Sequence, residues 1–301
     1  MKDQKLFILL SAITFSVNAF AQKSDPYRAD FSKPARIPGM NLVWNEEFNI
    51  NGKPDTASWI YEKGFVRNQE LQWYQPDNAN CINGLLVIEG RREKISNPNF
   101  VAGSNDWRRG REYAEYTSAC IKTRGLKQWQ YGRFEIRARI DTACGSWPAI
   151  WTLGISGGWP GCGEIDIMEF FRREGVPIIL ANFAWGTEKR GIAKWDDLKK
   201  PLNDFTKGDP DWTKKFHIWR MDWDKDSIKL YLDDLLLNDM AVSECVNPDG
   251  FNPFLQLARH FRGARQVHVS SGYYDAKRHR SHLFACAKIL FVPGSSLGMR
   301  W

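Results

Sequence analysis

The chain has 301 residues, of which 43% are hydrophobic and 26% charged, and its formal net charge is +7. This length allows one large domain or two small ones, and the lack of linkers or internal repeats favours one. The charge does not indicate a nucleic-acid partner. Residues 257–301 contain eight Lys or Arg and one acidic residue, so they carry the whole excess and the rest of the chain is neutral overall.

The first 21 residues are typical of a secretory signal peptide. Two lysines precede an apolar run from Leu6 to Val17, and Ala19-Phe20-Ala21 provides a cleavage site with small residues. A membrane anchor would need about 20 apolar residues, and this run is shorter. We therefore expect no membrane span and a mature protein that starts at Gln22 and is secreted or periplasmic.

The six cysteines are scattered along the chain and form no C-x-x-C pair. This spacing does not favour a zinc site, and it predicts no metal-binding residues. Export permits disulfides, but the sequence does not assign their pairing.

Alternating hydrophobicity predicts β-strands along the chain. Residues 133–140, "RFEIRARI", alternate strictly, and residues 227–238 alternate until Asp233-Asp234, which is typical of a hairpin turn. Shorter apolar runs occupy 84–93, 149–154 and 163–171. Because no segment sustains a helical period, the pattern favours an antiparallel sandwich or barrel.

The 14 tryptophans suggest a carbohydrate ligand. We expect about half to fill the core, but several aromatic residues lie among Gly, Pro, Asn and Gln, as loop residues do. Flat aromatic faces beside amides and carboxylates can stack on a sugar ring and bind its hydroxyls. The candidates are Trp73, Tyr74, Trp147, Trp151, Trp159 and Trp185.

The stretch "GEIDIMEFF" contains three acids in an apolar run. Side chains of a strand alternate between faces, so Glu164 and Asp166 share one face and Glu169 should point to the other. A β-bulge at Ile167-Met168 would return Glu169 to the face of the first two acids. We therefore predict that all three acids line one groove.

Paired carboxyl groups are what glycoside hydrolysis requires, with one ionised and one protonated. A third acid between them would raise the pKa of the acid/base and could bind the nucleophile. Two other interpretations of the three acids, a solvated strand and a calcium site, are weaker. A solvent-exposed strand would be less apolar, and a calcium loop would be rich in Asn, Asp and Gly.

The motif "GEIDIMEF", with "GSWPAIWTLG" upstream, resembles the E-[IL]-D-x-x-E signature of glycoside hydrolase family 16 in its bulged form, as in laminarinases. The resemblance extends over about residues 40–256, through "NQELQWY", "YGRFEIRARI" and "DWDKDSIKLYLDD". It implies a concanavalin-like all-β jelly-roll sandwich, in which two curved antiparallel sheets form an open substrate groove.

The resemblance also implies roles for individual residues. Glu164 would be the nucleophile, Glu169 the acid/base, and Asp166 would tune the pair. Asn68 would bind sugar hydroxyls, and Arg67 lies where an arginine could bind sulfate. Three tryptophans would contact the substrate, with two lining the groove and one stacking on the sugar: Trp147, Trp151 and Trp185. The loop residue Trp159 is a further candidate for substrate binding.

The resemblance ends near Gln256, so we assign 22–256 to the catalytic domain. Relatives continue into two closing strands, whereas residues 257–301 are basic and lose the strand alternation. We predict a change of reading frame near Gln256, which would remove the central strands of both sheets and expose their edges. In the family, a structural calcium ion takes a ligand from the closing strand, so its binding to this chain is doubtful. We expect that the protein requires no cofactor.

The sequence thus predicts a monomeric, secreted endo-glycosidase that retains configuration and cleaves β-1,3- or mixed-linkage β-1,3/1,4-glucan. A hydrolase of sulfated or neutral galactan, such as an agarase or porphyranase, is the alternative within enzymes. A carbohydrate-binding protein without activity is the alternative from another class.

Overall fold

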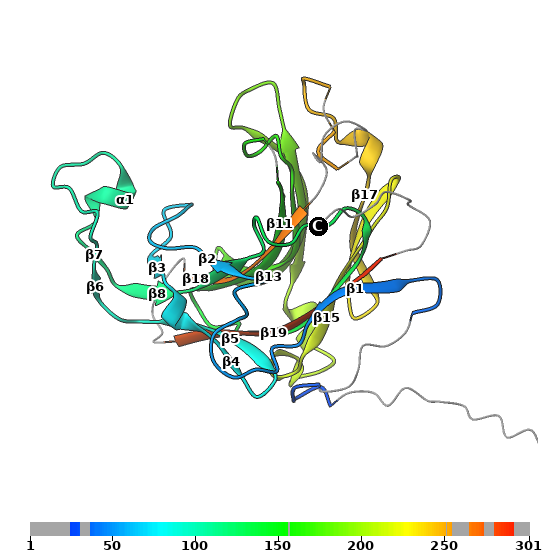
Figure 1. Cartoon of the computed structure of the whole chain (residues 1–301), viewed down its shortest axis with the longest axis horizontal. Coiled ribbons are helices and arrows are strands. Elements are labelled where there is room, and N and C mark those ends of the chain that lie inside the picture. The colour runs from blue at the N-terminus through cyan, green and yellow to red at the C-terminus, as the bar shows by residue number, and fades with distance from the viewer. Residues whose placement is uncertain are drawn as a thin grey trace, which may run out of the picture.

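A computed structural model of the chain describes residues 25–30, 37–155, 157–250, 252–254, 265–273 and 280–291. The predicted signal peptide lies outside these residues. Two large, mainly antiparallel sheets make up most of the described structure, and Figure 1 shows them as separate layers, with β11 and β13 in one and β15 and β17 in the other. The predicted all-β sandwich is confirmed. No helix in the described part of the chain is long and apolar enough to cross a membrane.

The first sheet has ten strands. Eight follow one another in the order β17 (Leu235–Ala241), β16 (Ser227–Leu232), β15 (His217–Trp223), β10 (Gly132–Ile140), β19 (Arg280–Phe291), β5 (Leu85–Arg91), β8 (Tyr116–Ser118) and β3 (Gln72–Tyr74). Two more strands pair with β19 and β5, respectively: β1 (Asn41–Glu46) and β4 (Ala79–Ile82).

The second sheet has seven strands and carries the acid motif. Its order is β14 (Ala193–Pro201), β13 (Val176–Gly186), β12 (Glu164–Arg173), β11 (Ser146–Gly154), β18 (Arg265–Tyr273), β9 (Cys120–Lys122) and β2 (Ile60–Tyr61). A small separate sheet pairs β6 (Ile95–Ser96) with β7 (Tyr113–Ala114). The described α-helices are the short α1 (Trp107–Gly110) and α2 (Asn203–Thr206).

The core lies between the two large sheets, as the alternating segments predict. Alternate residues of β10, among them Phe134 and Ile136, are buried, and so are alternate residues of β16. Asp233 and Asp234 have φ angles of 46° and 69° and connect β16 to β17, so the predicted hairpin turn is confirmed.

Residues 257–301 contribute a strand to the middle of each large sheet, contrary to our expectation. β18 pairs with β11 and β9, and β19 pairs with β10, β5 and β1. The prediction that this segment would leave the sheets without closing strands is therefore wrong, because its backbone supplies β18 and β19. Sequence alternation missed them because it reports the side chains of one strand, whereas these strands are defined by pairing with distant ones. The altered reading frame stays a prediction.

Candidate active site

A β-bulge in β12 brings the three acids to one face of the second sheet. The register of β12 against β13 shifts between Asp166 and Glu169, where Ile167 and Met168 together lie opposite Ala181. Both Ile167 and Met168 are fully buried in the core. Because these two consecutive residues both use the core face, Glu169 returns to the face of Glu164 and Asp166, and the predicted bulge is confirmed.

Glu169 sits in a site that favours its protonated form. The indole Nε1 of Trp147 donates to Oε1 of Glu169 at 3.0 Å, and the amide Nδ2 of Asn182 donates to Oε2 at 3.0 Å. Burial and the charge of Glu164 raise the pKa of Glu169 to about 7, although the two donors act to lower it. A carboxyl group with this pKa can donate a proton near neutral pH and then accept one.

Asp166 is the most enclosed of the three acids, with 3% of its surface exposed. Burial raises its pKa well above the usual value, and the negative charges of Glu169 and Glu164 add to this effect. Asp166, which lies between the other two acids in the sequence, therefore resists ionisation.

Glu164 lies at the start of β12 and is half-buried. The indole Nε1 of Trp159 donates to its Oε2 at 2.5 Å. This contact orients the carboxylate and stabilises its negative charge, which a nucleophile needs.

A wall opposite β12 comes from residues 67–74. Ten residues line the small hollow between them: Arg67, Asn68, Glu70, Tyr74, Trp147, Ala149, Trp151, Glu164, Asp166 and Glu169. Asn68 and Gln69 have φ angles of 54° and 53°, so the chain turns tightly there and presents Asn68 at the surface.

Arg67 forms a partly buried ion pair with Glu62 behind this wall. The Oε1 atom of Glu62 also accepts a hydrogen bond from Lys122 Nζ at 3.0 Å. Burial would raise the pKa of Glu62, but the charges of Arg67 and Lys122 outweigh it and lower the pKa to about 2. The Arg67 guanidinium lies 5.1 Å from the centre of the Trp151 ring. Arg67 thus supports the groove wall with its charge already matched.

Most residues predicted from the sequence meet at this hollow, but Trp73 and Trp185 do not. Arg67, Asn68, Trp147 and Trp151 line it together with the three acids, and Trp159 contacts Glu164. Trp185 is wrong as a substrate contact because it is 4% exposed and belongs to the core. Its neighbour Ala184 pairs with Glu164 and takes the groove face, so Trp185 points to the other face.

The sequence analysis missed two residues of the site, Glu70 and Asn182, whereas Tyr74 was among its aromatic candidates. Glu70 and Tyr74 line the hollow, and the Tyr74 hydroxyl donates to Glu70 Oε2 at 3.0 Å. Burial raises the pKa of Glu70. The "ELQWY" stretch could have indicated Glu70, since alternate residues of a strand share a face and Glu70 is in phase with Tyr74. Asn182 had no local signal, because only the pairing of β13 with β12 brings it to Glu169.

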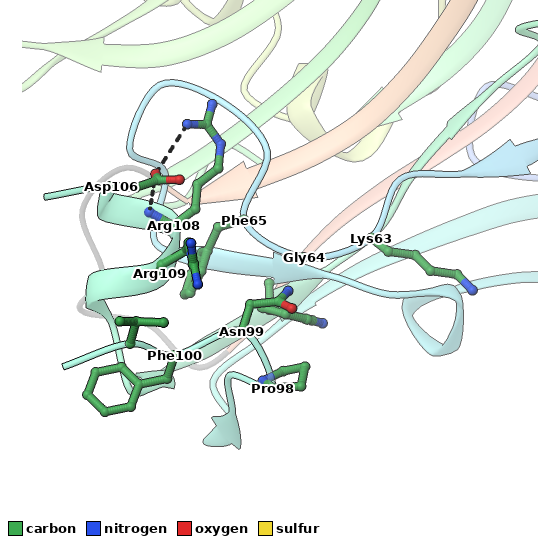
Figure 2. Close-up of a pocket in the computed structure, with 11 residues that line it drawn as sticks. Lys63, Gly64, Phe65, Pro98, Asn99, Phe100, Asp106, Arg108 and Arg109 are labelled. Carbon is green, nitrogen blue, oxygen red and sulfur yellow. Dashed lines mark hydrogen bonds and ion pairs between the residues drawn. The ribbon is translucent and has the colours of Figure 1, made fainter. Parts of the chain in front are cut away.

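A second, larger cavity of about 460 Å³ lies away from the acids, between residues 63–65, Trp73 and the loop 98–109 (Figure 2). Its one acidic lining residue is Asp106, which caps α1 by accepting from the Arg108 amide and so cannot form a carboxyl pair. Arg108 donates to the Val66 carbonyl at 2.8 Å. This loop therefore holds the backbone that leads to Arg67 and Asn68.

A carboxyl group with a pKa raised to about 7 and an oriented carboxylate on one strand, beside aromatic side chains, fit the pair of acids that a glycoside hydrolase uses. The family model for glycosyl hydrolases family 16 matches residues 89–259, and the chain belongs to this family. Among the described residues, no three His, Cys, Asp or Glu side chains are grouped to hold a metal ion.

Several proteins are similar to this chain. The β-glucanase of Rhodothermus marinus is 35% identical over 230 residues, which cover 71% of this chain and 70% of the relative. The keratan-sulfate endo-1,4-β-galactosidase of Sphingobacterium multivorum is 30% identical over 58% of this chain and 43% of its own length. A solved structure reported with endo-acting O-glycanases of the human gut microbiota superposes with a TM-score of 0.75 and 28% identity, and covers 87% of this chain and 94% of its own.

Proposed function

We propose that the protein is an exported, monomeric endo-glycosidase that hydrolyses β-1,3- or mixed-linkage β-glucan with retention of configuration. The observation that carries the proposal is the bulge in β12, which brings Glu164 and Glu169 to one face and leaves the second with a pKa of about 7. The similarity to the Rhodothermus β-glucanase supports glucan as the substrate.

The chemistry follows from the state of the two carboxyl groups. The Glu164 carboxylate attacks the anomeric carbon while Glu169 gives its proton to the glycosidic oxygen, which leaves with the downstream sugar. Glu169, now ionised, takes a proton from water, and the resulting hydroxide releases the sugar from Glu164. Trp147 and Asn182 hold the Glu169 carboxyl in place through both half-reactions.

A second candidate substrate is a galactose-containing glycan. The Sphingobacterium enzyme acts on keratan sulfate, and the O-glycanase similarity concerns mucin breakdown. Arg67 gives little support to a sulfated substrate, because Glu62 already pairs with its charge. We therefore place glucan first and test the galactose-containing glycans beside it.

The first test is release of reducing ends by the purified protein from barley mixed-linkage glucan, laminarin, agarose, keratan sulfate and mucin O-glycans. Short oligosaccharides from a glucan would support the proposal, and activity on the last three alone would favour the second candidate. Proton NMR of the first product would reveal whether configuration is retained.

The matched variant is Glu164→Ser. Loss of the nucleophile should lower kcat by about 10⁴-fold or more while glycan binding remains. A wild-type protein that binds glycans and shows no hydrolysis would instead be a carbohydrate-binding protein, which would contradict the proposal.

A further inference from the structure

The edge strand β14 turns alternate side chains to the two faces of the second sheet. Leu198 packs against the core, and Asp196 accepts a hydrogen bond from Asn238 of β17 in the other sheet at 3.4 Å. These residues therefore face the interior of the sandwich. Trp195 immediately precedes Asp196, so its side chain points to the opposite face and faces the groove, with 44% of its surface exposed.

The pairing registers place Trp195 in the same cross-strand row as Glu164. Glu164 pairs with Ala184 of β13, and Ala184 pairs with Trp195. Two strand spacings separate the acid from the tryptophan, which is about 10 Å between their backbones. The residue between them in this row is Ala184, which has only a methyl side chain.

A second exposed tryptophan lies at the same end of β12. Trp159 is 48% exposed, and its Nε1 contacts Glu164. The Asn247 side chain accepts from the Gly186 amide and donates to the Gly161 carbonyl, both at 2.8 Å. Asn247 thereby ties the loop that carries Trp159 to the end of β13, beside the row that leads to Trp195.

We propose that Trp195, together with Trp159, forms a sugar-binding platform on the β14 side of the catalytic acids. The substrate chain then crosses the strands, from the wall at Arg67 and Asn68 over the acids to Trp195. The ligand is a sugar residue of the substrate, whose apolar C–H face stacks on the indole. This inference rests on the proposed function, since a platform at this distance is useful only when a glycan occupies the acids.

Trp195 lies on an edge strand, where an exposed apolar side chain can favour association between sheet edges. Two other residues of β14 that share this face, Asp197 and Lys199, form an ion pair with each other. Trp195 is thus the strand's aromatic contact on this face, and the ion pair forms a polar border beside it.

The test compares Trp195→Ala, Trp195→Phe and the control Lys194→Ala, a neighbouring exposed residue on the opposite face. Activity is measured on the polysaccharide that the wild type cleaves, together with the lengths of its products. We expect Trp195→Ala to lower kcat/KM by about 5- to 10-fold, from the range for aromatic contacts, and to change the product lengths. Trp195→Phe should recover most of the rate, and Lys194→Ala should equal wild type.

Binding to the Glu164→Ser protein separates this contact from catalysis. Adding Trp195→Ala should weaken oligosaccharide binding by the same factor. Unchanged kcat/KM and binding in Trp195→Ala would overturn the platform while leaving the proposed function standing, and so would equal losses in the Ala and Phe variants. A wild type that cleaves none of the glycans would overturn the proposed function and the platform with it.

Discussion

The molecule buries glutamates in two neighbouring regions and drives their pKa values in opposite directions. On β12, Glu169 has only acids and neutral donors around it, and burial raises its pKa to about 7. Behind the groove wall, Glu62 is also buried, but Arg67 and Lys122 lower its pKa to about 2. The presence or absence of a paired cation decides which carboxyl group can act as an acid near neutral pH.

This contrast distinguishes the acids of β12, which would carry out the reaction, from the Glu62 ion pair, which supports the groove wall. The Glu62 pair holds the wall in one geometry because its charges are matched, whereas the acids of β12 keep a proton available because theirs are not. Glu70 lies between the two regions, where burial raises its pKa and the Arg67 charge opposes the rise.

Breaking the ion pair should have the largest effect. Arg67→Met leaves Glu62 buried with Lys122 alone, so we expect the free energy of unfolding to fall by about 2–3 kcal/mol. Urea unfolding measures this change in the free energy of unfolding. The double variant Arg67→Met/Glu62→Gln should recover part of the loss, and a single variant as stable as wild type would show that the pair does not support the wall.

The two glutamates should affect stability in opposite pH windows. The folded pKa of Glu62 lies below its unfolded value of 4.5, so its stabilisation is present above pH 4.5 and is lost as the pH falls towards 2. The folded pKa of Glu169 lies above 4.5, so its contribution is present below pH 4.5 and is lost as the pH rises through 7.

Two amide variants measure these windows separately. Relative to wild type, the free energy of unfolding of Glu169→Gln should increase as the pH rises from 4.5 to 7. That of Glu62→Gln should increase relative to wild type as the pH falls from 4.5 to 2. Differences that do not vary with pH in these windows would contradict both assignments.

The smallest expected effect concerns the donors to Glu169. Trp147 and Asn182 lower its pKa, so removing either donor should raise it. In Trp147→Phe or Asn182→Ala, the alkaline limb of kcat/KM should move upward by about one pH unit, as expected for a loss of about 1.4 kcal/mol. Trp159→Phe serves as a control because its contact is with Glu164. A downward shift in the first two variants would contradict the assignment.

The sequence predicts the features that depend on local alternation. The strands at 133–140 and 227–232, the bulge at Ile167-Met168 and the shared face of the acids all follow from side-chain period. The pair between Glu62 and Lys122 spans 60 residues, so no local pattern reports it. Trp185 received its role from the family resemblance, whereas the register of β13 against β12 turns its side chain to the core.

Titration of the side-chain carboxyl carbons by NMR tests the central claim most directly, with Glu169→Gln and Glu62→Gln used to assign the two signals. The account predicts that Glu169 titrates near pH 7 and Glu62 near pH 2 in the same wild-type sample. A Glu169 signal that titrates below pH 5 would contradict it, because the acid that the proposed reaction needs would then be ionised at neutral pH.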